Sequence, residues 1–246
     1  MVFAACRTGS VHVAFRPAPH ARYRYAVDVH ADTTTAVQGR PTNHRITDEH
    51  FKADHTVLSA DRGGVLVAVR LQAPGVPERS FQVRFDRAAS LAAVQQVESI
   101  PASVLGDLGL SEVFPAAAGA PPARALRPGA SWPIDQAVRL PGTADTRLTG
   151  RGRLDRLGVI GGRQIATVKS EYSFPVHQVS QDVVIDGTEE TSVDTSQALK
   201  DGAVQFVHAT TTGHFRLTFP PPAGVAGPPL TGSLAVEVSS TTRRVG

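Results

Sequence analysis

The sequence predicts a mainly β protein, a curved antiparallel meander that forms a half-barrel or barrel with a short helical insert in mid-chain. Apolar and polar residues alternate with period two in many segments, as they do in half-buried strands. Gly-Gly, Asp-Gly and Pro-Gly pairs separate these segments, and short turns between neighbouring strands favour antiparallel pairing. A sheet of about ten strands curls rather than staying flat.

Length and composition predict one globular domain. The chain has 246 residues, of which 41% are hydrophobic, and we expect residues 11–246 to form a single β-rich domain. A net charge of +3 is too small to indicate a nucleic-acid partner. The single cysteine excludes a disulfide framework and any multi-cysteine metal site. No run approaches the ~18 apolar residues of a membrane-spanning helix.

The first half of the chain contains the opening strands. Alternation over residues 11–29, interrupted by prolines, predicts an opening hairpin. A mixed polar segment at 43–59 continues the sheet. Alternating strands follow at 65–71 and 81–85, each introduced by a turn that contains glycine.

The pattern changes over residues 87–114, which predict the helical insert. Leu91, Val94 and Val97 follow a helical spacing, and a second piece begins at Pro101. We expect this insert to cover one face of the curved sheet. Residues 115–130 are rich in Pro, Ala and Gly and predict an irregular linker.

The sheet pattern resumes in the second half. A strand at 147–155 pairs back with residues 164–174, and a long hairpin turns at Asp201-Gly202. The last strand carries alternating apolar residues around Val236. Together with the first half, these segments complete the meander.

The amino terminus predicts a lipid anchor. Phe3-Ala-Ala-Cys6 has the form of a bacterial lipobox, in which the cysteine thiol carries a diacylglyceryl group. A signal peptide also needs a charged start and an apolar run, and only five residues precede Cys6. Either residues 1–10 are a truncated signal with a linker, or the likeness is accidental. With the anchor, we expect the protein on the extracytoplasmic face of the cell membrane, or secreted.

Several short motifs point to a family. The opening hairpin, a Phe-Pro pair at 114–115, Leu-Arg-Pro-Gly-Ala-Ser-Trp at 126–132 and Gly-Arg-Gln-Ile-Ala at 162–166 resemble uncharacterised bacterial lipoprotein β-domains. The architecture is also similar to lipoprotein carriers of the LolA-like half-barrel type. That resemblance implies a curved sheet with helices over its concave face, which holds acyl chains. It implies no catalytic residues.

The residues contain no catalytic constellation. The sequence has no nucleophile elbow, phosphate loop, dinucleotide fingerprint or zincin motif. His50 and His55 are an odd number of residues apart and so face opposite sides of a strand, while His208 and His214 stand ~20 Å apart on one side. We interpret the histidines as solvated strand positions. We therefore expect no enzyme, cofactor or metal site.

Two features of residues 147–155 bear on binding. Arg147, Arg151 and Arg153 share one strand face, which either meets anionic headgroups or is a solvated surface. Gly150 and Gly152 lie on the other face, where missing side chains let another element approach closely.

The sequence therefore predicts a non-enzymatic carrier or binder of a hydrophobic ligand, a lipid or acyl chain, that acts as a monomer. The alternative is a structural or interaction lipoprotein of the cell envelope with a filled core and no ligand. The two differ in whether apolar side chains surround a void. The candidate ligand-contacting residues are Tyr23, Tyr25, Val27, Val67, Val69, Phe81, Val83, Leu91, Val94, Leu105, Leu108, Phe215 and Leu217.

Overall fold

The computed structural model describes residues 9–61, 64–75, 77–85, 91–98, 120–138, 146–179, 182–221 and 227–246. None of these residues forms a helix that is long and apolar enough to cross a membrane. The regular elements of the described residues are strands: β1 (Arg22–Val37), β2 (Arg40–Asp61), β3 (Gly64–Gln72), β4 (Arg79–Phe85), β5 (Leu91–Glu98), β6 (Ser131–Val138), β7 (Thr146–Ile160), β8 (Arg163–Val179), β9 (Val184–Ala198), β10 (Val204–Phe219) and β11 (Leu230–Arg244).

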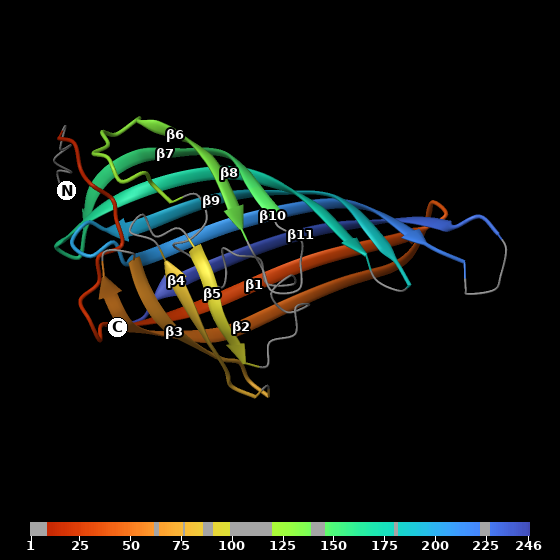
Figure 1. Cartoon of the computed structure of the whole chain (residues 1–246), viewed down its shortest axis with the longest axis horizontal. Helices are drawn as coiled ribbons and strands as arrows, with labels where there is room; N and C mark the ends of the chain where they lie inside the picture. Colours follow the sequence, from red (N-terminus) through yellow and green to blue (C-terminus); the bar gives the residue numbers. More distant parts are fainter. Residues whose placement is uncertain are drawn as a thin grey trace.

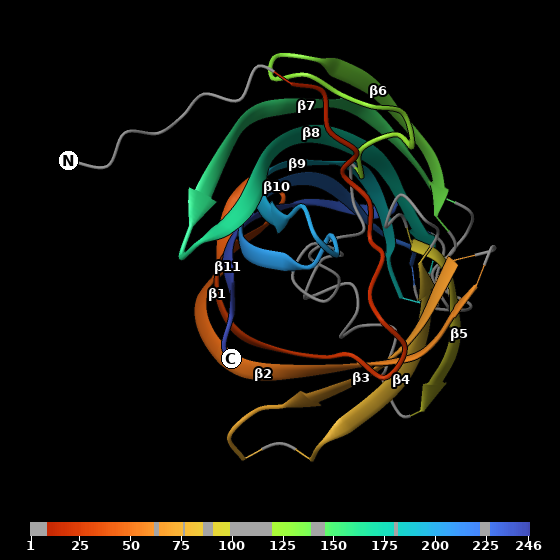
Figure 2. The ribbon, with the colours of Figure 1, turned by 90° about the vertical axis from the view of Figure 1, so that its left-hand side faces the viewer.

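All eleven strands form one antiparallel sheet in the order β5-β4-β3-β2-β1-β11-β10-β9-β8-β7-β6. Strands that follow one another in the chain are neighbours, except β5 and β6, and β1 also pairs with β11, so the first and last strands lie side by side. The sheet curls until its edge strands, β5 and β6, come within 8 Å of each other, Cα to Cα (Figure 2). Among the described residues no ladder joins these edges. The predicted antiparallel β architecture is confirmed as an open sheet.

The long strands divide the sheet into two halves. Seven strands have 15 to 22 residues, well above the usual length of about 3–10. Figure 1 shows that β1, β2 and β8–β11 run on past the short strands β3–β6. We call the part beside the short strands the proximal half and the extension the distal half. In β1, for example, residues 23–29 are alternately buried, whereas residues 31–37 are all half-buried.

An N-terminal strap, residues 9–21, crosses the proximal opening of the curled sheet (Figure 2). Val11 and Leu126 exchange two backbone hydrogen bonds of 2.8 Å, and the Arg16 amide donates to the Asp201 carbonyl at 2.7 Å. The predicted opening hairpin is therefore wrong, because β1 pairs with β2 and β11 instead. The apolar–polar alternation in this segment nevertheless reflects its burial, since the side chains of Val13 and Phe15 both lie in the core.

The helical insert predicted over 87–114 is wrong for its described part, because residues 91–98 form strand β5. Two β-bulges interrupt the pairing of β4 with β5, and at each of them β5 has one extra residue. Leu91 therefore stands opposite Phe85 and Val94 opposite Val83. Residues three apart along β5 therefore lie opposite residues two apart along β4. The spacing of three in the sequence of β5 resembles the period of a helix. The remaining residues of the predicted insert lie outside the described part of the chain.

The core of the protein fills the proximal half. Phe15 of the strap lies between two aromatic rings, with centroids 6.2 Å from Tyr23 and 5.8 Å from Phe85. Leu148 and Leu154 of β7 are almost fully buried on the same side. The strap and the short strands therefore close this half around a packed interior.

The predicted turn at Asp201-Gly202 is confirmed and also receives the strap. Gly202 has a φ of +73°, and an ideal Cβ there would lie 2.0 Å from the Ala14 carbonyl oxygen. Only glycine combines this left-handed backbone with so close an approach. The strap therefore packs closely against the β9–β10 turn.

Candidate functional site

Six of the thirteen predicted ligand-contacting residues belong to the packed proximal core. The ring centroids of Tyr25 and His55 are 4.9 Å apart in an edge-on contact, so the space beside Tyr25 is occupied by protein. Burial raises the pKa of the Tyr25 hydroxyl above its ordinary value. The members of the predicted set that the core contains are Tyr23, Tyr25, Val27, Val67, Val69 and Val83.

The other predicted residues are dispersed. Phe81, Leu91 and Val94 lie in β4 and β5, in neighbouring strands of the sheet rather than on a facing helix. Phe215 and Leu217 lie in the distal half of β10. Cys6, Leu105 and Leu108 lie outside the described residues.

The distal half continues the inner face of the sheet beyond the core. Cross-strand partners share a face, and the register aligns Val176, Gly187, Phe215 and Leu234 across β8 to β11. One row further along, Ile185 stands opposite Leu217. We call Val176, Ile185, Phe215, Leu217 and Leu234 the distal apolar face. None of these five side chains belongs to the core cluster.

Glycines shape this face by letting an aromatic ring lie flat. An ideal Cβ on Gly213 would lie 2.5 Å from the Phe215 ring, and one on Gly187 would lie 2.7 Å from it. Both glycine positions are therefore covered by the same side chain. A ring that lies against its own sheet fills less of the space above the sheet than one that stands upright. The Phe215 ring thereby keeps this part of the inner face low and apolar, while the register places Glu189 and Arg45 elsewhere on the same face.

The proximal core contains polar atoms without partners. His55 Nε2, Trp132 Nε1 and Thr242 Oγ1 are buried and have no hydrogen-bond partner among the residues that the structure describes. Burial lowers the pKa of His55 to about 4, because desolvation disfavours the imidazolium. The expectation that His55 is a solvated strand position is wrong. His50, in contrast, is exposed and bonded to Asp28 at 2.7 Å, so the opposite-face prediction is confirmed.

The two glycines of β7 also behave as close-approach positions. The Trp132 indole lies over Gly152, where an ideal Cβ would be 2.3 Å from the ring. At Gly150 an ideal Cβ would lie 2.0 Å from the Glu171 carbonyl oxygen. The packing prediction is confirmed, and neither glycine borders a void.

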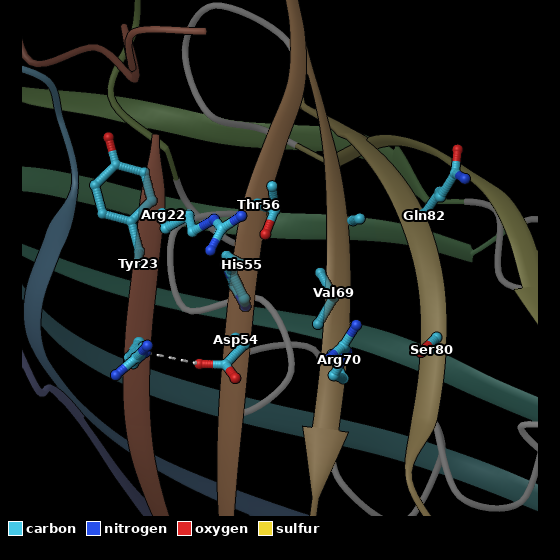
Figure 3. A pocket seen from close by; sticks show the side chains of 11 residues that line it. Arg22, Tyr23, Asp54, His55, Thr56, Val69, Arg70, Ser80 and Gln82 are labelled. Carbon is cyan, nitrogen blue, oxygen red and sulfur yellow. Dashed lines mark ion pairs between the residues drawn. The ribbon is translucent and has the colours of Figure 1, made fainter. Parts of the chain in front are cut away.

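The outer face of β1–β4 contains a hollow that the sequence patterns do not predict (Figure 3). It has a volume of about 450 Å³ and is open to solvent. Its charged members come from three consecutive strands, and the register of these strands brings the side chains together. We call it the arginine groove; its outer-face lining residues are Arg22, Arg24, Asp54, Thr56, Ala68, Arg70, Ser80 and Gln82.

A second open hollow lies along the distal parts of β9, β10 and β11. Its volume is about 640 Å³, and residues of both faces line it, among them His214, Arg216, Phe215 and Leu234. Neither hollow is an enclosed apolar cavity. A hydrophobic ligand would therefore have to lie in an open trough rather than inside a closed pocket.

The outer face of the β1–β2 pair carries a ladder of histidine–aspartate pairs. His30 bonds Asp48 at 2.7 Å, and His44 bonds Asp32 at 2.8 Å. The hydrogen bond to Asp48 raises the pKa of His30 above its ordinary value. In the described part of the chain, no three histidine, cysteine or acidic side chains come together in a way that could hold a metal ion.

The arginines of β7 lie on the exposed side of their strand. Arg147 pairs with Asp135 across to β6, and this contact lowers the pKa of Asp135 and raises that of Arg147. Arg153 pairs with Asp155 at 3.3 Å. The interpretation as a solvated surface fits this arrangement, because two of the three predicted arginines have acidic neighbours.

No protein-family model matches this chain, and no curated protein is significantly similar to it in sequence. The likeness to lipoprotein β-domains thus remains a hypothesis carried by short motifs. One of them, at 126–132, leads into β6. Leu126 there is bonded to the strap, and Trp132 packs on Gly152.

Proposed function

We propose that the protein is a non-enzymatic binder or carrier of a hydrophobic ligand, a lipid or acyl chain. The observation that carries this proposal is the distal apolar face. It lies on the concave side of the sheet, beyond the packed core and beyond the short strands that wall the proximal half (Figure 1). An apolar surface of this kind favours contact with another apolar surface.

The dimensions of the trough suit an acyl chain. The distal apolar face extends across four neighbouring strands, β8 to β11, which span about 14 Å at ~4.8 Å between strands. One leaflet of a bilayer has a hydrocarbon depth of about 15 Å, half of the ~30 Å core. A single acyl chain can therefore lie along the distal apolar face without entering the proximal core.

The closed proximal half supports an open-ended carrier rather than a channel. The strap crosses that end, and Val13 and Phe15 seal it with apolar side chains. A ligand would enter from the distal end or from the concave side. The LolA-like resemblance implies helices over the concave face, whereas in the described residues it is the strap that covers the proximal end.

We place the protein on the extracytoplasmic face of the cell membrane, anchored through Cys6, and as a monomer. The support is the Phe-Ala-Ala-Cys tetrad together with a β domain that begins shortly after it. The intact mass of the denatured protein, produced from the full gene in a bacterial envelope, tests the anchor. A diacylglyceryl increment on Cys6 is expected, and a free thiol there would contradict it.

The alternative, a structural or interaction lipoprotein, is favoured by one observation. The proximal interior is close-packed, with residues such as Val57, Val83 and Leu154 at 0% exposure. If the protein's own side chains fill the distal half equally in solution, no room is left there for a ligand. Ligand uptake therefore decides between the two functions.

A fluorescent fatty acid titrated into the protein tests the carrier function. We expect saturable uptake, and we expect Leu234→Asp to weaken it by about tenfold or more, because a carboxylate on the distal apolar face is costly to desolvate. Ser233→Asp is the matched control, since Ser233 is the next residue of β11 and is exposed on the opposite face. Uptake that does not saturate, or equal losses in both variants, would contradict the proposal.

A further inference from the structure

The arginine groove is shaped by the cross-strand register of four strands. One row across the outer face runs Arg22, Thr56, Ala68 and Gln82, as successive partners in β1, β2, β3 and β4. Ala68 has the shortest side chain of this row. The side chains of this row are therefore lowest at β3, between the arginine of β1 and the glutamine of β4.

The second row supplies most of the charge. It runs Arg24, Asp54, Arg70 and Ser80 over the same four strands (Figure 3). Three guanidinium groups thus line the groove with one carboxylate, from Asp54. The lining side chains have a net charge of +2, three minus one.

These arginines keep most of their donors free. Arg24 Nε lies 3.6 Å from Asp54 Oδ1, which is too long for a good hydrogen bond, and Arg70 Nε contacts Glu78 at 3.1 Å. The side chain of Arg22 forms no hydrogen bond or ion pair within the described residues. A guanidinium has five N–H donors, so several from each arginine point to solvent or into the groove.

We propose that the arginine groove binds a phosphate group, either of a phospholipid headgroup or of a soluble phosphate ester. A tetrahedral phosphate offers oxygens to guanidinium groups that approach from different sides, whereas a carboxylate offers two oxygens in one plane. The volume of about 450 Å³ holds such a group with part of the molecule that carries it.

The site is independent of the hydrophobic trough. The groove lies on the outer face of the proximal half, and the distal apolar face lies on the inner face of the distal half. One acyl chain cannot reach both. The strap ends beside Arg22, where the His20 amide donates to the Val57 carbonyl of β2. A membrane held near the strap would therefore present its headgroups to this end of the protein.

The test uses the full chain and two probes. Glycerol 3-phosphate, titrated by calorimetry, probes the soluble ester, and phosphatidylcholine vesicles with and without phosphatidylglycerol probe the headgroup. The double variant Arg22→Gln/Arg70→Gln removes two charges from the groove. Arg151→Gln/Arg153→Gln is the matched control, because it removes two exposed arginines from β7. Thermal unfolding verifies that both variants fold.

We expect the groove variant to bind about tenfold more weakly and the control to change by less than about twofold. The pair Arg22→Lys/Arg70→Lys keeps the charge but loses the guanidinium fork, and should bind at an intermediate strength. Binding of both probes indicates a general phosphate site, and binding to anionic vesicles alone identifies the headgroup as the source. Equal losses in the groove variant and the control, or no binding of either probe, would overturn the proposal.

Discussion

At the scale of single residues, His55 shows most clearly what the core imposes. It lies in β2 with its ring against Tyr25, and its Nε2 atom is buried without a partner. Protonation would place an unpaired positive charge in an apolar interior. For this reason its pKa falls from 6.5 to about 4 in the folded protein.

His55 should make the protein less stable in mild acid. Between pH 6.5 and about 4 the unfolded chain binds a proton at this residue that the folded chain does not. Stability from this source is complete above pH 6.5, declines as the pH falls towards 4, and totals up to about 3 kcal/mol. We expect urea unfolding at pH 7.5 and pH 4.5 to show this loss, and His55→Phe to reduce it.

His30 serves as an internal check on the direction of this pH dependence of stability. The pKa of His30 is raised by Asp48, so its contribution is largest at low pH and is lost as the pH rises through its folded-state pKa. His30→Gln should therefore not reduce the acid loss. An unchanged acid loss in His55→Phe would show that His55 is not its source.

The face of each residue could be predicted from sequence, but its burial could not. The odd separation of His50 and His55 correctly places them on opposite faces. Which of the two is inside depends on strands β1 and β3 at their sides and on the strap above, all of them distant in sequence. Arg22 and Arg70 show the same limit, because only the register brings them into one groove.

At the scale of elements, the alternation of apolar and polar residues locates most strands. It gives the wrong element where bulges or prolines interrupt the regular pattern. The β9–β10 hairpin and its turn at Asp201-Gly202 follow the prediction. β5 does not, because two bulges give its apolar residues a spacing of three. The strap alternates like a strand, yet its prolines end it before it can pair with β1.

The strap should depend on Gly202. Gly202→Ala adds a methyl group at a φ of +73° and directs it at the Ala14 carbonyl oxygen, 2.0 Å away. We expect a loss of more than about 2 kcal/mol in urea unfolding and faster hydrogen exchange over residues 11–16, as the strap lifts away.

Gly39→Ala is the control for that substitution. Gly39 has nearly the same φ, +75°, and nothing lies within 4 Å of an ideal Cβ there. It therefore carries the backbone strain without the collision, and should cost only about 1 kcal/mol. Equal costs for the two variants would mean that the strap does not rest on Gly202.

At the scale of the whole molecule, the chain forms one curled sheet whose two faces differ in chemistry. The concave face is filled in the proximal half and carries the distal apolar face beyond it, while the convex face carries ion pairs and the arginine groove. The sequence predicted an antiparallel meander, but it could not reveal that β1 joins β11 or that β5 and β6 are the open edges. Those features depend on pairings between residues far apart in the chain.

The central claim is that the distal apolar face holds an acyl chain. Native mass spectrometry of the protein, purified gently from a bacterial envelope, tests it most directly. We predict a population carrying one lipid that leaves on collisional activation, and its loss in Leu234→Asp but not in Ser233→Asp. A protein that carries no lipid, and gains none after incubation with phospholipid vesicles, would contradict the claim.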